Sequence, residues 1–186
     1  MLKNFQENIR KKQLFSKKDI ILLTVSGGVD SCVMLDLFSQ IDIPIAIAHC
    51  NFCLRGKESD QDEKLVRQLA HKYKVKIHVK HFDTKKESQE KNSSIQMTAR
   101  NLRYAWFDSL CKTNNYTQIA TAHHQNDVIE TLLFNLSKGT GIAGLHGILH
   151  KSGKIIRPIL FASKSDILTY AKNNALEWRD DASNQE

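Results

Sequence analysis

One stretch, residues 20–38, constrains the fold more than any other part of the chain. It opens with a short apolar run rich in β-branched residues, which is typical of a buried strand in a parallel sheet. A turn of small residues follows at 26–31, and apolar residues with helical spacing come next. Strand, glycine turn and helix together aim backbone N–H groups and the positive end of a helix at an anion. The stretch therefore predicts a phosphate-binding turn in an α/β fold.

The residues of this turn are all candidates for phosphate binding: Ser26, Gly27, Gly28, Val29, Asp30 and Ser31. The two glycines can adopt positive φ and approach phosphate oxygens without a Cβ in the way. The two serines add hydroxyl donors. A carboxylate beside a phosphate is repelled unless a divalent cation lies between them. We therefore interpret Asp30 as a ligand of Mg²⁺ or as a carboxylate that orients substrate.

The composition fits a single domain over residues 1–186. Hydrophobic residues make up 41% of the chain and charged residues 25%, as in ordinary globular proteins. Apolar runs stay short of the ~20 residues of a membrane helix, so we expect no membrane partner. Four cysteines and the lack of a signal-peptide core predict a cytoplasmic protein. The net charge of +7 permits a polyanionic partner without establishing one.

Strand and helix patterns alternate along the rest of the chain, which predicts a three-layer, Rossmann-like α/β fold with a mainly parallel sheet. Further strands are expected at 44–50, 75–79, 116–122 and 155–160. Helices are expected at 1–19, 58–73, 94–113 and 164–174, and a further helix is expected after the strand at 116–122. We expect residues 83–94 to be a mobile loop or a solvated linker. Two helices carry apolar stripes that should face the core: Ile95, Ala99, Leu102, Trp106 and Leu110, and Ile129, Leu132, Leu133 and Leu136.

Polar residues that follow the strands are candidate site residues, because ligands of open α/β sheets collect at the carboxyl ends of strands. His49 lies at the end of the strand at 44–50, and Asn51 and Arg55 follow it; all three could contact nucleotide or substrate, although an ordinary polar loop would look the same. Arg100 and Arg103 share one helix face, and two guanidinium groups suit phosphate or carboxylate recognition. Surface ion pairs are the alternative.

Asp127 and Glu130 lie three residues apart near the start of the helix that follows the strand at 116–122. Carboxylates are favoured at a helix N-terminus, so a structural role is open. Two acids at the rim of the sheet would also form a pocket for an ammonium group or a metal ion.

Cys50 and Cys53 form a C-x-x-C pair directly after a predicted strand. Zinc sites usually need four ligands, and no second pair stands at the spacing of a zinc finger. Redox C-x-x-C pairs normally open a helix. We interpret both cysteines as ordinary thiols near the site, with metal or sulfur chemistry as the alternatives.

The turn at 26–31 matches the S-G-G-x-D-S signature of PP-loop ATP pyrophosphatases. With four further segments, the chain resembles the tRNA(Ile)-lysidine synthetase family over nearly its whole length. The most selective part is A-T-A-H-x-x-x-D-x-x-E-T followed by G-T-G-x-x-G-L. The segments beyond the turn are 49–59, 99–104, 120–131 with 139–145, and 157–158 with 181–184.

The resemblance implies a PP-loop fold and ATP-dependent ligation of lysine to C2 of the wobble cytidine of a tRNA(Ile) with a CAU anticodon. An adenylated cytidine would be the intermediate, with pyrophosphate and AMP as products. ATP with Mg²⁺, L-lysine and that tRNA are the implied partners. Asp30 and Arg100 would act on ATP, with Arg103 contacting its phosphates or the tRNA backbone. Asp127 and Glu130 would hold the lysine substrate or deprotonate its ammonium group. His123 would orient these groups.

The sequence also departs from this family. Phe52 stands where the family usually has a second histidine, so no histidine role is implied there. Family members continue into a region that helps select the tRNA, so we expect this chain to be a fragment that binds ATP and modifies tRNA poorly.

Three other interpretations of the function stay open. They are a PP-loop tRNA thiolation enzyme that uses Cys50 and Cys53, an amide-forming synthetase of a small metabolite, and a nucleotide-binding module without turnover. The oligomeric state is also open, with a homodimer among the choices.

Overall fold

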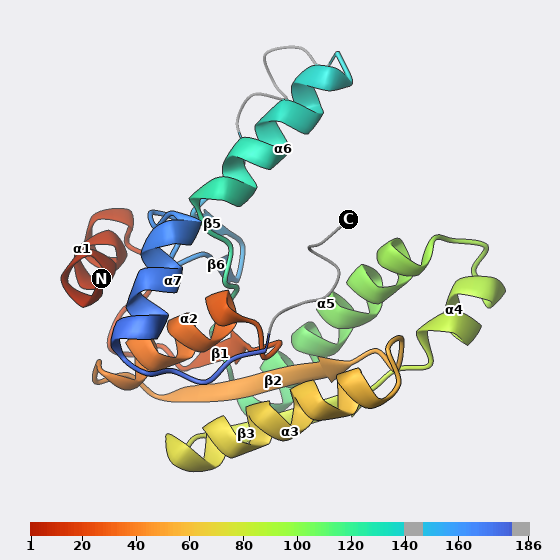
Figure 1. Cartoon of the computed structure of the whole chain (residues 1–186), viewed down its shortest axis with the longest axis horizontal. Helices are drawn as coiled ribbons and strands as arrows, with labels where there is room; N and C mark the ends of the chain where they lie inside the picture. The colour runs from red at the N-terminus through yellow and green to blue at the C-terminus, as the bar shows by residue number, and fades with distance from the viewer. Residues whose placement is uncertain (140–146, 180–186) are drawn as a thin grey trace.

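The structure is a computed structural model that describes residues 1–139 and 147–179. The strands are β1 (Ile21–Thr24), β2 (Ile45–Asn51), β3 (Lys76–His81), β4 (Gln118–Ala120), β5 (Lys151–Ser152) and β6 (Ile155–Ile156). They form one sheet in the order β3-β2-β1-β4-β6-β5 (Figure 1). Neighbouring strands pair in parallel, except that β5 is antiparallel to β6. The predicted α/β fold with a mainly parallel sheet is confirmed.

Helices cover both faces of this sheet. Successive residues of β1 point to opposite faces, as the strand geometry requires. Ile21 and Leu23 pack in one apolar cluster, whereas Leu22 packs with Phe107 and Leu110 in a second cluster. The predicted three layers are confirmed. The helices of the first cluster are α1 (Leu2–Lys12), α2 (Val29–Ser39), α3 (Lys57–Lys72) and α7 (Lys164–Asn173), and that of the second is α5 (Ile95–Asn114).

The apolar stripe predicted for α5 is only partly correct. Ala99 and Leu110 are buried, but 42% of Ile95 is exposed. The contact with the sheet falls on the second half of the helix, where Phe107 and Cys111 are buried instead. The first turns of α5 extend past the strands.

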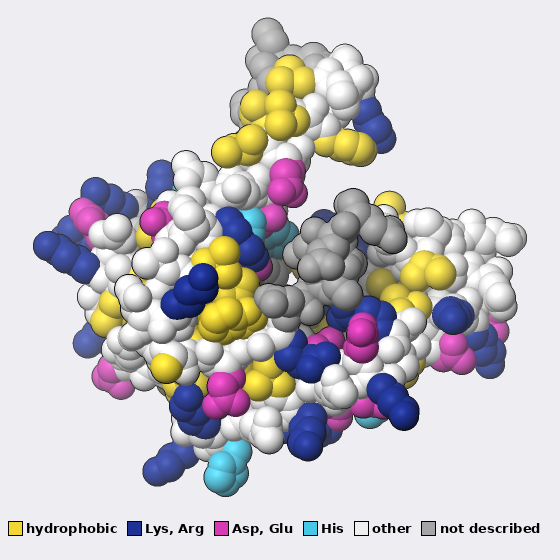
Figure 2. All heavy atoms as spheres, viewed as in Figure 1, with side chains coloured by type: hydrophobic (Ala, Val, Ile, Leu, Met, Phe, Trp, Pro, Cys, Tyr) yellow, Lys and Arg dark blue, Asp and Glu magenta, His cyan; other side chains and the backbone are white. Residues whose placement is uncertain are grey.

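Helix α6 (Gln125–Ser137) has the predicted apolar stripe, but the prediction that this stripe faces the core is wrong. α6 projects away from the sheet, and apolar side chains gather on its surface (Figures 1 and 2). The exposed fractions of Ile129, Leu133 and Leu136 are 52%, 59% and 50%. The predicted helical spacing of these apolar residues is therefore correct. In the part of the chain that the structure describes, their side chains are not buried in the core.

Local capping explains two further differences from the sequence prediction. Residues 83–94 contain a helix, α4 (Thr84–Glu90), because the Asp83 side chain accepts a hydrogen bond from the Lys86 backbone N–H over 3.2 Å. The N-terminal helix ends at Lys12, well before the predicted residue 19, because Gln13 adopts a left-handed conformation. No helix in the described part of the chain is long and apolar enough to cross a membrane.

Helices α2 and α7 run side by side, and Asp36 joins them. Its carboxylate accepts hydrogen bonds from the Tyr73 hydroxyl (2.8 Å), the Tyr170 hydroxyl (2.7 Å) and the Gln40 amide (2.8 Å). Burial, followed by the hydrogen bond to Asp36, raises the pKa of Tyr170 to about 12, so the phenol keeps its proton. Asp36 thereby fixes α7 and α3 to α2.

We expect Asp36→Ala to lower the free energy of unfolding by about 2 kcal/mol, because it leaves two tyrosine hydroxyls without their charged acceptor. Urea denaturation followed by circular dichroism measures this change. Asp42→Ala, at an exposed position just after α2, is the matched control and should change stability by less than about 0.5 kcal/mol. Equal losses in the two variants would contradict the role given to Asp36.

Candidate active site

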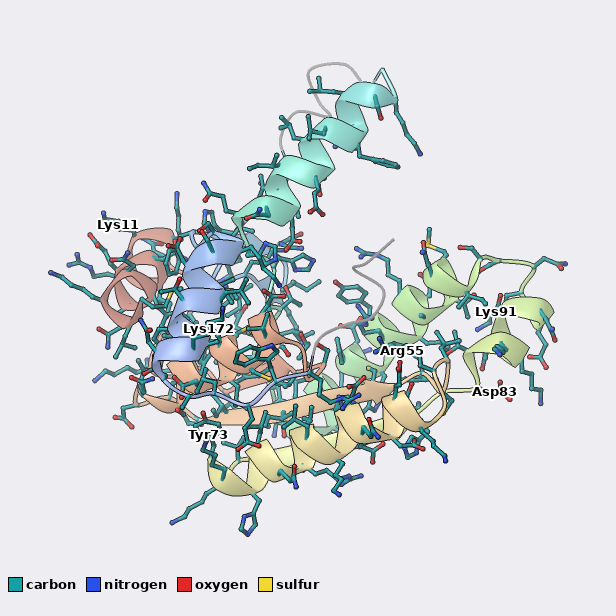
Figure 3. The ribbon with its side chains drawn as sticks, in the orientation of Figure 1. Lys11, Arg55, Tyr73, Asp83, Lys91 and Lys172 are labelled. Atoms are coloured by element: carbon teal, nitrogen blue, oxygen red, sulfur yellow. The ribbon has the colours of Figure 1, made fainter. Side chains whose placement is uncertain are left out.

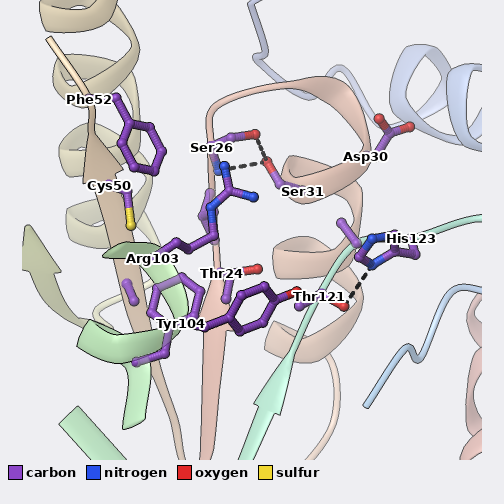
Figure 4. A pocket seen from close by; sticks show the side chains of 14 residues that line it. Thr24, Ser26, Asp30, Ser31, Cys50, Phe52, Arg103, Tyr104, Thr121 and His123 are labelled. Atoms are coloured by element: carbon purple, nitrogen blue, oxygen red, sulfur yellow. Dashed lines mark hydrogen bonds between the residues drawn. The ribbon is translucent and has the colours of Figure 1, made fainter. Parts of the chain in front are cut away.

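The turn between β1 and α2 is closed by the Ser31 hydroxyl. Its Oγ accepts hydrogen bonds from the backbone N–H groups of Ser26 (3.2 Å) and Gly27 (3.3 Å), and it donates to the Gly28 carbonyl (2.9 Å). Figure 4 shows the contact between Ser26 and Ser31. Gly27 has φ 101°, a conformation that glycine adopts without strain. Ser31, predicted as a phosphate donor, thus shapes the turn in this structure.

The N-terminus of α2 points out of this turn with its backbone donors available. Gly28 is the N-cap residue, and no described side chain caps the helix. The first N–H groups of a helix lack intrahelical acceptors, and together with the helix dipole they attract anions. By contrast, Ser163 and Asp166 cap the N-terminus of the neighbouring α7. The geometry predicted for the turn at 26–31 is present.

A cavity of about 240 Å³ lies beside this turn, at the carboxyl ends of β1 and β4 (Figure 4). The chain runs from β1 to β2 and β3 on one side and returns to β4 on the other, so this is the point where the strand order reverses. Ligands of open α/β sheets bind at such points. The polar side chains that line the cavity include Thr24, Ser26, Asp30, Arg103, Thr121 and His123.

A second, wider cavity of about 630 Å³ continues from the first toward the end of β2 and the first turns of α5. Ser26, Phe52 and Arg103 line both cavities. The Arg103 guanidinium lies over the Phe52 ring, 5.2 Å from its centroid. Arg100 lines the second cavity and lies over the Tyr104 ring at 5.0 Å. The two predicted arginines therefore face the same hollow as the turn.

The candidate residues His49 and Asn51, at the end of β2, and Arg55, in the loop after it, also line the second cavity, but each has a structural partner. His49 is 2% exposed, and its Nδ1 lies 2.8 Å from the Val25 carbonyl. Burial lowers the pKa of His49, which favours a neutral ring. Asn51 accepts from the Cys53 backbone N–H over 3.0 Å. Arg55 (Figure 3) donates to Asp62 over 3.0 Å, so all three help to hold the cavity wall.

Asp30 has a partner that the sequence reading missed. Lys164 Nζ lies 2.7 Å and 2.8 Å from the two carboxylate oxygens of Asp30. His124 Nε2 lies 3.6 Å from Asp30 on its other side, and its Nδ1 lies 3.6 Å from Asp127. One imidazole ring thus separates the carboxylates of Asp30 and Asp127. In the sequence, Lys164 is marked only as the first residue of the helix expected at 164–174.

The remaining predicted residues differ in their relation to the cavities. His123 lines the first cavity and lies 2.9 Å from the Thr121 hydroxyl, and burial lowers its pKa. Asp127 accepts a hydrogen bond from the His124 backbone N–H over 2.8 Å, which caps α6. Glu130 is exposed on α6. The structure therefore does not place these two acids among the residues that line either cavity, and their contact with lysine stays a prediction.

The two cysteines of the C-x-x-C pair lie in different environments. All four cysteines of the chain are free thiols. Cys50 lines both cavities, but burial raises its pKa to about 12, so the thiol stays protonated at neutral pH. Cys53 is exposed. Within 1–139 and 147–179, no group of three His, Cys, Asp or Glu side chains is arranged to hold a metal ion.

Sequence comparison finds curated relatives across almost the whole chain. The tRNA(Ile)-lysidine synthase of Chlorobaculum tepidum is 44% identical over 187 residues, covering 98% of this chain and 56% of that protein. The protein of the same name from Bacteroides thetaiotaomicron is 43% identical and covers 96% of this chain and 42% of that protein. The chain spans about half the length of the curated relatives it matches.

Solved structures show the same fold. The U34-tRNA thiolase NcsA from Methanococcus maripaludis has a TM-score of 0.76 at 18% identity, covering 96% of this chain and 66% of that one. The NH3-dependent NAD synthetase from Campylobacter jejuni has a TM-score of 0.63 at 14% identity, covering 94% and 70%. A model of the ATP-binding PP-loop domain matches residues 1–186, and with the turn geometry described above this shows that the chain belongs to the PP-loop domain family.

Proposed function

We propose that the chain is the catalytic domain of an enzyme that ligates L-lysine to C2 of the wobble cytidine in a tRNA(Ile) with a CAU anticodon. The observation that carries this proposal is the 44% identity with a tRNA(Ile)-lysidine synthase over 98% of the chain. The match covers 56% and 42% of these two relatives, so the proposal concerns the part of the enzyme that this chain resembles. The free cysteines agree with a cytoplasmic location.

The reaction would proceed in two displacements. In the first, the C2 oxygen of cytosine attacks the α-phosphorus of ATP, the bond between the α-phosphorus and the bridging oxygen breaks, and pyrophosphate leaves. In the second, the neutral ε-amine of lysine attacks C2, the C2–O bond breaks, and AMP leaves. The lysine ammonium must first lose a proton, because only the free amine has a lone pair. Activation as an adenylate makes the C2 oxygen a good leaving group.

Several residues would serve the first displacement. The N–H groups at the start of α2 would bind phosphate oxygens, where they also stabilise charge on the departing pyrophosphate. Arg103 lines both cavities, so it can reach the nucleotide from α5. Arg100 lies one turn earlier on α5 and would contact phosphate or the tRNA backbone. The chain's net charge of +7 also favours a polyanionic partner.

Asp30 fits a role in Mg²⁺ binding. Mg²⁺ is usually held by one or two carboxylates together with substrate phosphates and water. Asp30 is the acid in the first turn of α2 and lines the first cavity, so a nucleotide bound at the turn would bring phosphate oxygens to it. The ion would neutralise charge between the carboxylate and the phosphates.

Asp127 and Glu130 would provide the carboxylates for lysine. Support comes from the position of Asp127, which is separated from Asp30 by the His124 ring. His123, on the wall of the first cavity, would orient the groups that meet there. The tRNA-thiolation alternative is less well supported, because the Cys50 thiol is protonated at neutral pH and the matching relatives are lysidine synthases.

Incubation of the protein with ATP, L-lysine and isoleucine tRNA should yield AMP, pyrophosphate and a lysine-bearing cytidine. Nucleoside mass spectrometry of the digested tRNA detects the product, and thin-layer chromatography identifies the nucleotides. Enzyme in excess of tRNA ensures that a single turnover is enough to give detectable product. ADP with inorganic phosphate as products, or no mass change in the tRNA, would contradict the proposal.

Asp127→Asn should keep ATP binding within about threefold of the unaltered protein and lower lysine transfer by about tenfold or more, because one carboxylate–ammonium contact is lost. Calorimetry gives the ATP affinity, and radiolabelled lysine gives the transfer rate. Asp108→Asn, at an exposed position of α5, is the control and should leave both values unchanged. An unchanged rate of lysine transfer in Asp127→Asn would contradict the proposed role of Asp127 in binding lysine.

Replacing both Cys50 and Cys53 with alanine should leave lysine incorporation within about threefold, because neither thiol takes part in the proposed chemistry. The same radiolabel assay measures it. Thermal melting checks that the loss of the partly buried Cys50 side chain has not unfolded the protein. A folded double variant without activity would favour the thiolation enzyme instead.

A further inference from the structure

Lys164 is the cation closest to the carboxylate of the phosphate-binding turn, although 134 residues separate it from Asp30. Its Nζ contacts both carboxylate oxygens, at 2.7 Å and 2.8 Å. The side chains of Lys164 and Asp30 keep 33% and 27% of their surfaces exposed, so the pair lies at the rim of the site and a ligand can reach it.

The backbone of Lys164 is fixed by neighbouring elements. Its N–H donates to the Asn126 side chain over 3.0 Å, and the Gln125 N–H donates to the Ala162 carbonyl over 2.8 Å. At the other end of α7, Tyr170 is bonded to Asp36 of α2. Since Lys164 meets Asp30 and Tyr170 meets Asp36, α7 lies parallel to α2 and their N-termini are neighbours. The movable part of Lys164 is its four-carbon side chain.

The charges around the turn require a cation at this place. Asp30 and Asp127 bring two carboxylates to the edge of a site whose helix N-terminus is open to anions. A nucleotide triphosphate would bring further negative charge against Asp30. Lys164 already neutralises Asp30, and a lysine ammonium has three donors that can be shared between a carboxylate and a phosphate.

We propose that Lys164 is a phosphate-binding residue of this site, held on Asp30 until a nucleotide binds and then shared with or transferred to the β- and γ-phosphates. This rests on the proposed function only in that ATP is the ligand of the turn. Movement of Lys164 to phosphate would leave the Asp30 carboxylate free, and Asp30 would then be able to hold Mg²⁺. The ion pair therefore balances the charge of Asp30 before nucleotide binds.

Calorimetric titration of ATP and of AMP into the full chain tests this role, because AMP lacks the two outer phosphates. Lys164→Ala and Lys164→Gln should each lower ATP affinity by about tenfold or more and change AMP affinity by less than about threefold. Lys164→Arg should recover most of the ATP affinity, since it restores the charge. Lys172→Ala, at an exposed position in the last turn of α7 (Figure 3), is the matched control and should bind both nucleotides as the unaltered protein does.

The outcomes separate this inference from the proposed function. Equal ATP affinity in the unaltered protein and in folded Lys164→Gln would overturn the inference and leave ATP binding at the turn intact. Equal losses of ATP and AMP affinity, with a lower melting temperature, would show a purely structural ion pair and also overturn it. An unaltered protein that binds neither nucleotide would instead count against the proposed function.

Discussion

A turn that attracts phosphate while carrying a carboxylate is the constraint on which the rest of this structure depends. The open N-terminus of α2 favours anions, and Asp30 in its first turn opposes them. Two cations from distant elements offset the charge of this carboxylate and of a bound anion. Lys164 of α7 contacts Asp30, and Arg103 of α5 faces the cavity. The two cations approach the turn from helices on opposite faces of the sheet.

The strand order places these groups together. β1 lies in the interior of the sheet, between β2 and β4, so its carboxyl end is flanked by the loops that follow those two strands. His49 to Phe52 form one wall of the hollow, and Thr121 to His123 form the other. His49 and Asn51 bond to backbone groups, and Thr121 bonds to His123. They are therefore held in position before any ligand arrives, which lowers the entropic cost of binding.

Features encoded by local sequence could be predicted, and those decided by distant contacts could not. The strand–turn–helix at 20–38 follows from apolar pattern and glycine, and the sheet places the residues predicted at strand ends where they were expected. Lys164 escaped prediction because nothing near it in sequence marks its contact with Asp30. The stripe of α6 was misassigned because helical periodicity identifies an apolar face and not what covers it. Helix α4 was missed because a run of charges obscured the cap at Asp83.

The assembly of the hollow from five separate stretches of chain links ligand binding to the folding equilibrium of the whole domain. Residues near 24–31, 48–55, 99–104, 121–124 and 164 meet only when β1, β2 and β4 are paired and both helical layers are packed. A partly unfolded chain therefore has no remnant of the site that could retain nucleotide. By mass action, a ligand at 100 times its dissociation constant adds about 2.7 kcal/mol to the stability of such a domain. The cellular nucleotide pool would then act on the lifetime of the folded chain as well as on its chemistry.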